Sequence, residues 1–114
     1  MVFNGELKQH YQVIFTMNNE SVIKTFLSGG QAKTPLRTIN CGYYSYKGRT
    51  LYTDGNNLIN YKTTIATLKE NKLYLNINKY SNTTSHIQSK IRQIATSKGL
   101  EIVEVKGIDE YINR

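Results

Sequence analysis

The residues best suited to chemistry lie between Lys79 and Arg92, where a hydroxyl-rich stretch leads into a basic helix. Short hydroxyl and amide side chains cap the N-terminus of a helix, and the free N–H groups there bind anions. The pattern predicts a surface that binds a phosphate or an acidic partner. Its candidate residues are Lys79, Tyr80, Ser81, Thr83, Thr84, His86, Lys90 and Arg92. The alternative is that the hydroxyls serve only as an over-supplied helix cap.

These residue types do not favour catalysis. A general-base role for His86 needs a third group to orient the imidazole, and the nearest acids along the chain are Glu70 and Glu101. The single cysteine, Cys41, provides neither a disulfide framework nor the spacing of a metal finger. No His, Cys or Asp set has metal-ligand spacing, so no metal or cofactor is expected. We therefore expect a binding protein that is not an enzyme.

A second candidate surface combines tyrosines with cations in the stretch from Tyr43 to Tyr52. On a single strand, Tyr44 and Tyr46 would share one face, while Lys47 would lie on the other. Aromatic rings and cations on a sheet stack nucleobases and hold phosphates. We take Tyr46, Lys47 and Arg49 as the second set of binding residues. The alternative is that tyrosine is simply a good strand former.

The charge is concentrated in the middle of the chain. The 114 residues carry a formal net charge of +7, and the stretch 21–100 holds twelve Lys or Arg against two acids. Such a field suits nucleic acid or an acidic protein surface. The length suits a single domain, residues 1–114. With neither a signal peptide nor a membrane span in the sequence, we expect a cytoplasmic protein without a membrane partner.

The hydrophobic pattern predicts an α+β domain. We expect a first strand at 11–16, a helix at 20–27 that begins at Asn18 or Asn19 and ends at Gly29-Gly30, and a short segment at 36–40. A meander of three strands should follow at 42–53, 58–68 and 72–78, with turns at 54–57 and 70–71 and a possible bulge at Gly48.

The main helix should begin at Ser81, Thr83 or Thr84 and end at Lys98-Gly99. Its apolar stripe is Ile87, Ile91, Ile94 and Ala95. A last strand is expected at 100–105 and a short tail at 108–114. The result is a mostly antiparallel sheet, a three-strand meander with flanking strands, covered by one main helix.

The stretches 60–66, 73–76 and 79–86 resemble a small domain in phage and plasmid proteins of Firmicutes. That family has no assigned chemistry, and the resemblance implies a mobile-element setting. In size and composition the chain also looks like anti-CRISPR proteins. The resemblance implies an inhibitor whose partner is a CRISPR effector nuclease or its guide RNA or target DNA. The alternative is a free-standing DNA- or RNA-binding accessory protein. The sequence does not define the oligomeric state.

Overall fold

The structure is a computed structural model that describes residues 16–108. Its elements in chain order are α2 (Asn19–Leu27), β1 (Leu36–Asn40), β2 (Ser45–Arg49), β3 (Leu51–Asp54), β4 (Asn57–Asn60), β5 (Thr63–Lys69), β6 (Lys72–Asn76), α3 (Asn82–Ser97) and β7 (Glu101–Val105). The strand expected at 11–16 and the tail expected after Ile108 lie almost wholly outside the described residues.

Five strands form the main sheet in the order β3-β4-β5-β6-β7. The first four make an antiparallel meander, and β7 lies parallel to β6 because the chain crosses over through α3. The architecture is therefore α+β with a mostly antiparallel sheet, as the pattern predicts.

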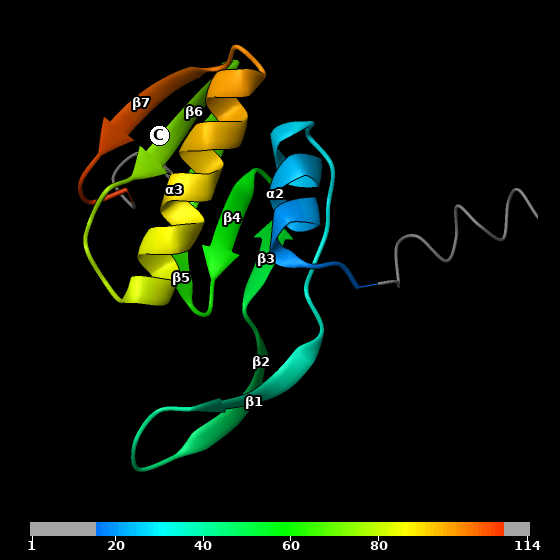
Figure 1. The fold of residues 1–114 in the computed structure, drawn as a ribbon, viewed down its shortest axis with the longest axis vertical. Coiled ribbons are helices and arrows are strands. Elements are labelled where there is room, and N and C mark those ends of the chain that lie inside the picture. Colours follow the sequence, from blue (N-terminus) through cyan, green and yellow to red (C-terminus); the bar gives the residue numbers. More distant parts are fainter. Residues whose placement is uncertain (1–15, 109–114) are drawn as a thin grey trace, which may run out of the picture.

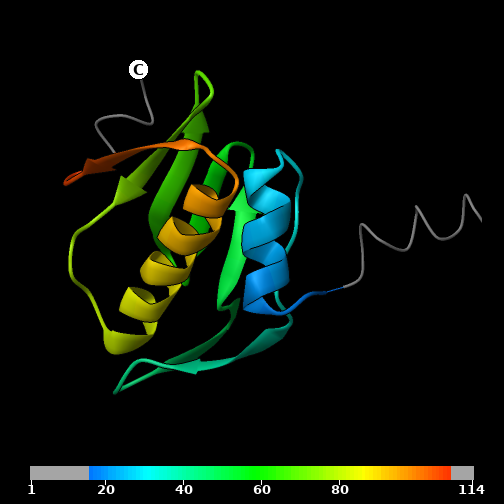
Figure 2. The same ribbon diagram turned by 45° about the horizontal axis from the view of Figure 1, so that its top comes forward.

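Two helices, not one, cover the same face of this sheet (Figures 1 and 2). Helix α2 packs against β3, α3 packs against β6 and β7, and the two helices also pack against each other. Both helices contribute to one core, in which Ile23, Phe26, Leu58, Leu73 and Ile91 are essentially inaccessible. The expectation of a single covering helix is thus wrong, because the apolar side of α2 is buried as deeply as that of α3.

The helix ends agree with the sequence. The Asn18 side chain accepts a hydrogen bond from the Ser21 N–H at 2.8 Å, and Ser81 accepts one from Thr84 at 3.2 Å. Caps of this kind stabilise a helix by about 1 kcal/mol. Gly29 and Gly99 adopt the left-handed conformation, with φ angles of +86° and +76°, and this conformation ends the two helices.

Strands β1 and β2 form a separate antiparallel hairpin outside the main sheet. We call residues 36–49 the hairpin arm. It projects from the body below β3 (Figure 1), and none of its residues belongs to the core cluster. At its base, the segment before the arm remains bound to β3, since the Thr34 N–H donates to the Leu51 carbonyl at 2.9 Å.

The three-strand meander is wrong in two places. The stretch 42–53 is divided into β2 and β3, which belong to different sheets, with the break at Thr50. Gly48 is neither a turn nor a bulge: it stays in register opposite Arg37. A Cβ at Gly48 would lie 2.7 Å from the Tyr46 ring, so this position is kept small by a tyrosine lying over it.

The stretch 58–68 is likewise divided, into β4 and β5, by a two-residue turn at Tyr61-Lys62. Tyr61 has a φ of +57°. Tyrosine rarely adopts this conformation, so the residue type did not predict a turn here. The other two turns lie where expected. Glu70 and Asn71 both have positive φ, whereas in the β3–β4 turn only Gly55 does, which fits type II′ rather than type I′.

Candidate nucleic-acid interface

The residues predicted to form one surface at the start of α3 do not lie together in the structure. Thr84 is buried, and its hydroxyl donates to Asn60 Oδ1 on β4 at 2.6 Å. Ser81 is occupied as the helix cap. Tyr80 is half exposed, and its hydroxyl accepts a hydrogen bond from Asn76. The Thr84 hydroxyl is therefore engaged within the fold rather than presented to a ligand.

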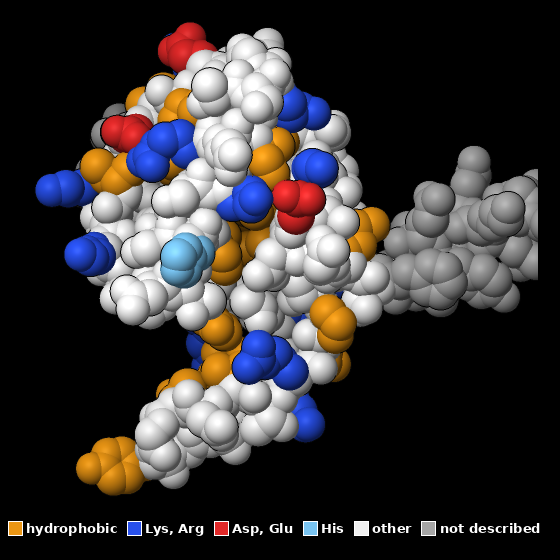
Figure 3. All heavy atoms as spheres, viewed as in Figure 1, with side chains coloured by type: hydrophobic (Ala, Val, Ile, Leu, Met, Phe, Trp, Pro, Cys, Tyr) orange, Lys and Arg blue, Asp and Glu red, His pale blue; other side chains and the backbone are white. Residues whose placement is uncertain are grey.

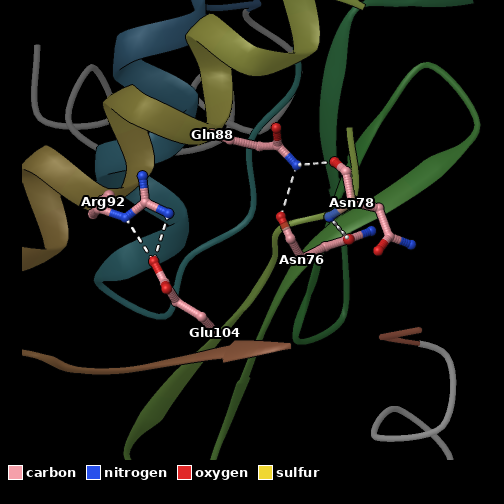
Figure 4. Close-up of polar contacts among 5 residues, drawn as sticks. All are labelled: Asn76, Asn78, Gln88, Arg92 and Glu104. Carbon is pink, nitrogen blue, oxygen red and sulfur yellow. Dashed lines mark hydrogen bonds and ion pairs between the residues drawn. The ribbon is translucent and has the colours of Figure 1, made fainter. Parts of the chain in front are cut away.

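The two cations of α3 point to different partners. Lys90 lies 3.4 Å from Glu20 on α2, which also pairs with Lys24 at 3.6 Å. Arg92 donates from Nε and Nη2 to Glu104 Oε2 on β7, at 2.9 and 2.6 Å (Figure 4). Each of these two cations is thus paired with an acid from another element, although Lys90 shares Glu20 with Lys24.

The remaining predicted residues of this region are Lys79, Thr83 and His86, all exposed. Lys79 and Arg92 line a hollow of about 250 Å³ beside Gln88. The buried Gln88 amide donates to the carbonyls of Asn76 and Asn78, at 2.7 and 3.1 Å (Figure 4). These bonds fix the helix against the end of β6. Sequence analysis missed Gln88, although it is four residues from Thr84 and shares its buried side.

The Glu20 carboxyl shows the effect of the paired cations. The Lys90 ammonium that bonds to it, together with Lys24, holds the pKa of Glu20 below its ordinary value. The Lys90–Glu20 pair is a contact between two helices, and the cluster of Glu20 with Lys24 and Lys90 keeps a net charge of +1.

The hairpin arm, in contrast, carries cations but no acidic residue. No acid occurs between Lys33 and Thr53, whereas on the body Lys24, Lys72, Lys90 and Arg92 each pair with a glutamate. Figure 3 shows acidic side chains on the body, next to basic ones, and basic side chains alone along the arm. Within residues 16–108 the arm therefore has the higher net positive charge per residue, +3 over fourteen residues against +5 over the other seventy-nine.

Cross-strand register assigns the arm's side chains to two faces. Thr38 and Lys47 are opposite each other on one face, and the Lys47 ammonium donates to the Thr38 hydroxyl at 2.9 Å. Ile39 and Tyr46 are opposite each other on the second face, where Ile39 is buried. Arg49 is partly buried and donates to the Thr34 carbonyl at 2.6 Å, which anchors the base of the arm.

The second face of the arm is turned toward the β4–β5 turn. The Lys62 ammonium lies 4.1 Å from the centre of the Tyr46 ring, a cation–π contact that joins turn and arm. Partial burial raises the pKa of the Tyr46 phenol, with smaller effects from Cys41, Tyr44 and Tyr61, so this ring stays neutral well into alkaline solution.

The tip of the arm presents aromatic surface. Tyr43 is fully exposed and Tyr44 is 61% exposed. Both lie in the loop between the strands rather than in a strand, which corrects the expected grouping of Tyr44 with Tyr46. The Cys41 N–H closes this loop by donating to the Tyr44 carbonyl at 2.8 Å. The free Cys41 is exposed beside it.

Within residues 16–108, no group of His, Cys, Asp and Glu side chains is arranged to hold a metal ion. The helices of that segment are too short and too polar to cross a membrane. No protein-family model, curated protein sequence or solved structure matches the chain, so these comparisons neither support nor refute the resemblance to phage and anti-CRISPR proteins.

Proposed function

We propose that the chain is a non-enzymatic nucleic-acid-binding protein whose contact surface is the hairpin arm. The single observation that carries this proposal is the concentration of cations without acidic partners on a projecting, tyrosine-tipped β-ribbon. Cations hold phosphates, while exposed tyrosines offer rings on which bases stack. A two-stranded ribbon is also narrow enough to enter a nucleic-acid groove.

The proposal moves the site from α3 to the arm. Of the residues predicted for the arm, Lys47 is exposed and Arg49 is partly exposed. Tyr46 lies on the arm's second face, where it contacts Lys62. Arg37 adds an exposed cation that sequence analysis did not select. Arg37 lies in a stretch of sequence without acids. This feature points to a binding role only once the structure shows that the stretch projects from the body.

The test is fluorescence anisotropy of labelled DNA and RNA at two salt concentrations. The arm variant Arg37→Gln plus Lys47→Gln should bind at least about tenfold more weakly than the natural chain, because two phosphate contacts are lost. The matched control, Lys90→Gln plus Arg92→Gln, removes the same charge from α3. It should bind normally. Equal losses in the two variants would mean that only net charge matters and would contradict the arm as the site.

A second function is favoured by a different observation. Leu36 is 59% exposed at the base of the arm beside Arg37, and the exposed Tyr43 and Tyr44 lie at its tip. Tyrosine and arginine dominate the energetics of protein–protein interfaces. The arm is therefore also suited to an inhibitor of the anti-CRISPR type, which docks on an effector nuclease. Such an inhibitor would co-elute with a purified effector free of nucleic acid, and it would bind labelled oligonucleotides only weakly even at low salt.

A further inference from the structure

A hollow of about 480 Å³ lies between the second face of the arm and the β4–β5 turn. The arm lines it with Arg37, Asn40 and Tyr46, and the turn contributes Tyr61. The Lys62–Tyr46 contact beside it holds the two walls together. The hollow is thus built from two elements that belong to different sheets.

Tyr61 holds its place at a conformational cost. Its φ of +57° is strained by about 1 kcal/mol or more for most residues with a Cβ, and glycine would remove that strain. Two hydrogen bonds fix the start of the turn: the Tyr61 N–H donates to the Thr50 carbonyl at 3.0 Å, and the Asn60 side-chain amide donates to the same carbonyl at 2.7 Å. A strained residue held this firmly points to a function for its side chain.

The lining has the chemistry of a nucleobase site. A half-buried ring offers a stacking surface, and the Arg37 guanidinium, on the same face of the arm as Tyr46, binds phosphate or stacks. Lys62 already covers one face of Tyr46, so Tyr61 is the ring left to stack. A base can enter such a hollow only after leaving its helical stack.

We propose that this hollow receives one unstacked nucleobase, with Tyr61 as the stacking ring, so that the preferred ligand is single-stranded nucleic acid. The inference rests on the proposed function of the arm and adds the class of nucleic acid to it. The remaining cations, Lys47 and Arg49, face the opposite side and carry the phosphate backbone past the base.

The test compares a labelled oligothymidine of about twelve nucleotides with a duplex of equal length. The natural chain should bind the single strand at least about tenfold more tightly than the duplex. Tyr61→Gly removes the ring and also relieves the strain, so the variant folds at least as stably. It should lose about tenfold in affinity for the single strand and little for the duplex. Tyr61→Phe should retain binding.

Asn71→Gly is the matched control, since Asn71 has a φ of +64° in the β5–β6 turn, far from the arm. It should bind both ligands normally. If Tyr61→Gly binds the single strand as well as the natural chain does, or if duplex and single strand bind equally, the base site is wrong. The arm proposal would survive that result, because the Arg37→Gln plus Lys47→Gln variant would still bind weakly. Binding of neither ligand would overturn both proposals.

Discussion

At the scale of single residues, Thr84 connects the start of α3 to the sheet. Its buried hydroxyl serves the Asn60 side chain, which in turn holds the Thr50 carbonyl. Thr84→Val keeps the shape but leaves Asn60 Oδ1 without its partner, so it should lower the free energy of unfolding by about 1–3 kcal/mol. Urea titration measures this loss.

Thr83→Val is the matched control, since Thr83 is exposed one position earlier on the same helix. It should change the free energy of unfolding by no more than about 0.5 kcal/mol. A Thr84→Val variant as stable as Thr83→Val, but with weaker nucleic-acid binding, would return Thr84 to the binding surface and contradict its structural role.

Glu20 makes stability depend on pH. Its pKa is lower in the folded chain than the ordinary 4.5, so its stabilising effect is complete above that value and disappears as the pH falls through the folded pKa. Glu20→Gln should therefore unfold at a lower urea concentration than the natural chain near neutral pH. The two midpoints should converge in acid well below 4.5. Glu70→Gln, at an exposed turn, is the control, and its midpoint should not differ from that of the natural chain in a pH-dependent way. A difference in midpoint between Glu20→Gln and the natural chain that is constant at all pH values would refute the ion-pair explanation.

At the scale of elements, the arm should be separable from the fold. None of its residues lies in the core cluster, and Leu36 and Arg49 are opposite each other at its base. Replacing residues 36–49 with Asn-Gly should leave cooperative thermal unfolding intact. The loss should not exceed the roughly 1.5–3 kcal/mol of one buried aliphatic side chain, that of Ile39.

The same deletion should abolish nucleic-acid binding in the anisotropy assay, because it removes the unbalanced cations and the exposed tyrosines. Circular dichroism gives the control for folding. A deleted variant that is folded and still binds with unchanged affinity would place the interface elsewhere on the molecule.

Local signals in the sequence predicted the elements that local chemistry controls. The caps at Asn18 and Ser81, the glycine stops and the turn at Glu70-Asn71 all rest on residue types with known backbone preferences. The division of 42–53 between two sheets depends on tertiary pairing, and a turn at Tyr61 has no residue that signals it. Both were therefore missed.

The binding surface was the harder prediction for the same reason. Lys90 and Arg92 appear unpaired in sequence, because Glu20 and Glu104 are brought to them only by folding. Lys47 and Arg49 were selected as part of an aromatic and basic strand, and they are part of the proposed site. What sequence could not supply was the projection of that strand away from the body, which makes its charge accessible.

At the scale of the whole molecule, the arm carries three cations and no acid, whereas the rest of the described chain combines ten cations with five acids. If the arm is the interface, binding should release counterions in proportion to the arm's cations and the neighbouring Lys62. If Arg37, Lys47, Arg49 and Lys62 each neutralise one phosphate of a single strand, a plot of log K against log salt should have a slope of about −3. Lys47→Gln should make it shallower by about 0.7, whereas Lys90→Gln should leave it unchanged. A slope near zero would exclude phosphate contacts.

The most direct test of the arm as the interface is an amide chemical-shift map of the isotopically labelled protein, titrated with oligothymidine. The largest shifts should fall in residues 36–49 and at Tyr61-Lys62, with little change between Lys79 and Arg92. Shifts concentrated at the start of α3 would restore the helix as the binding surface. No shifts at low salt would contradict nucleic-acid binding altogether.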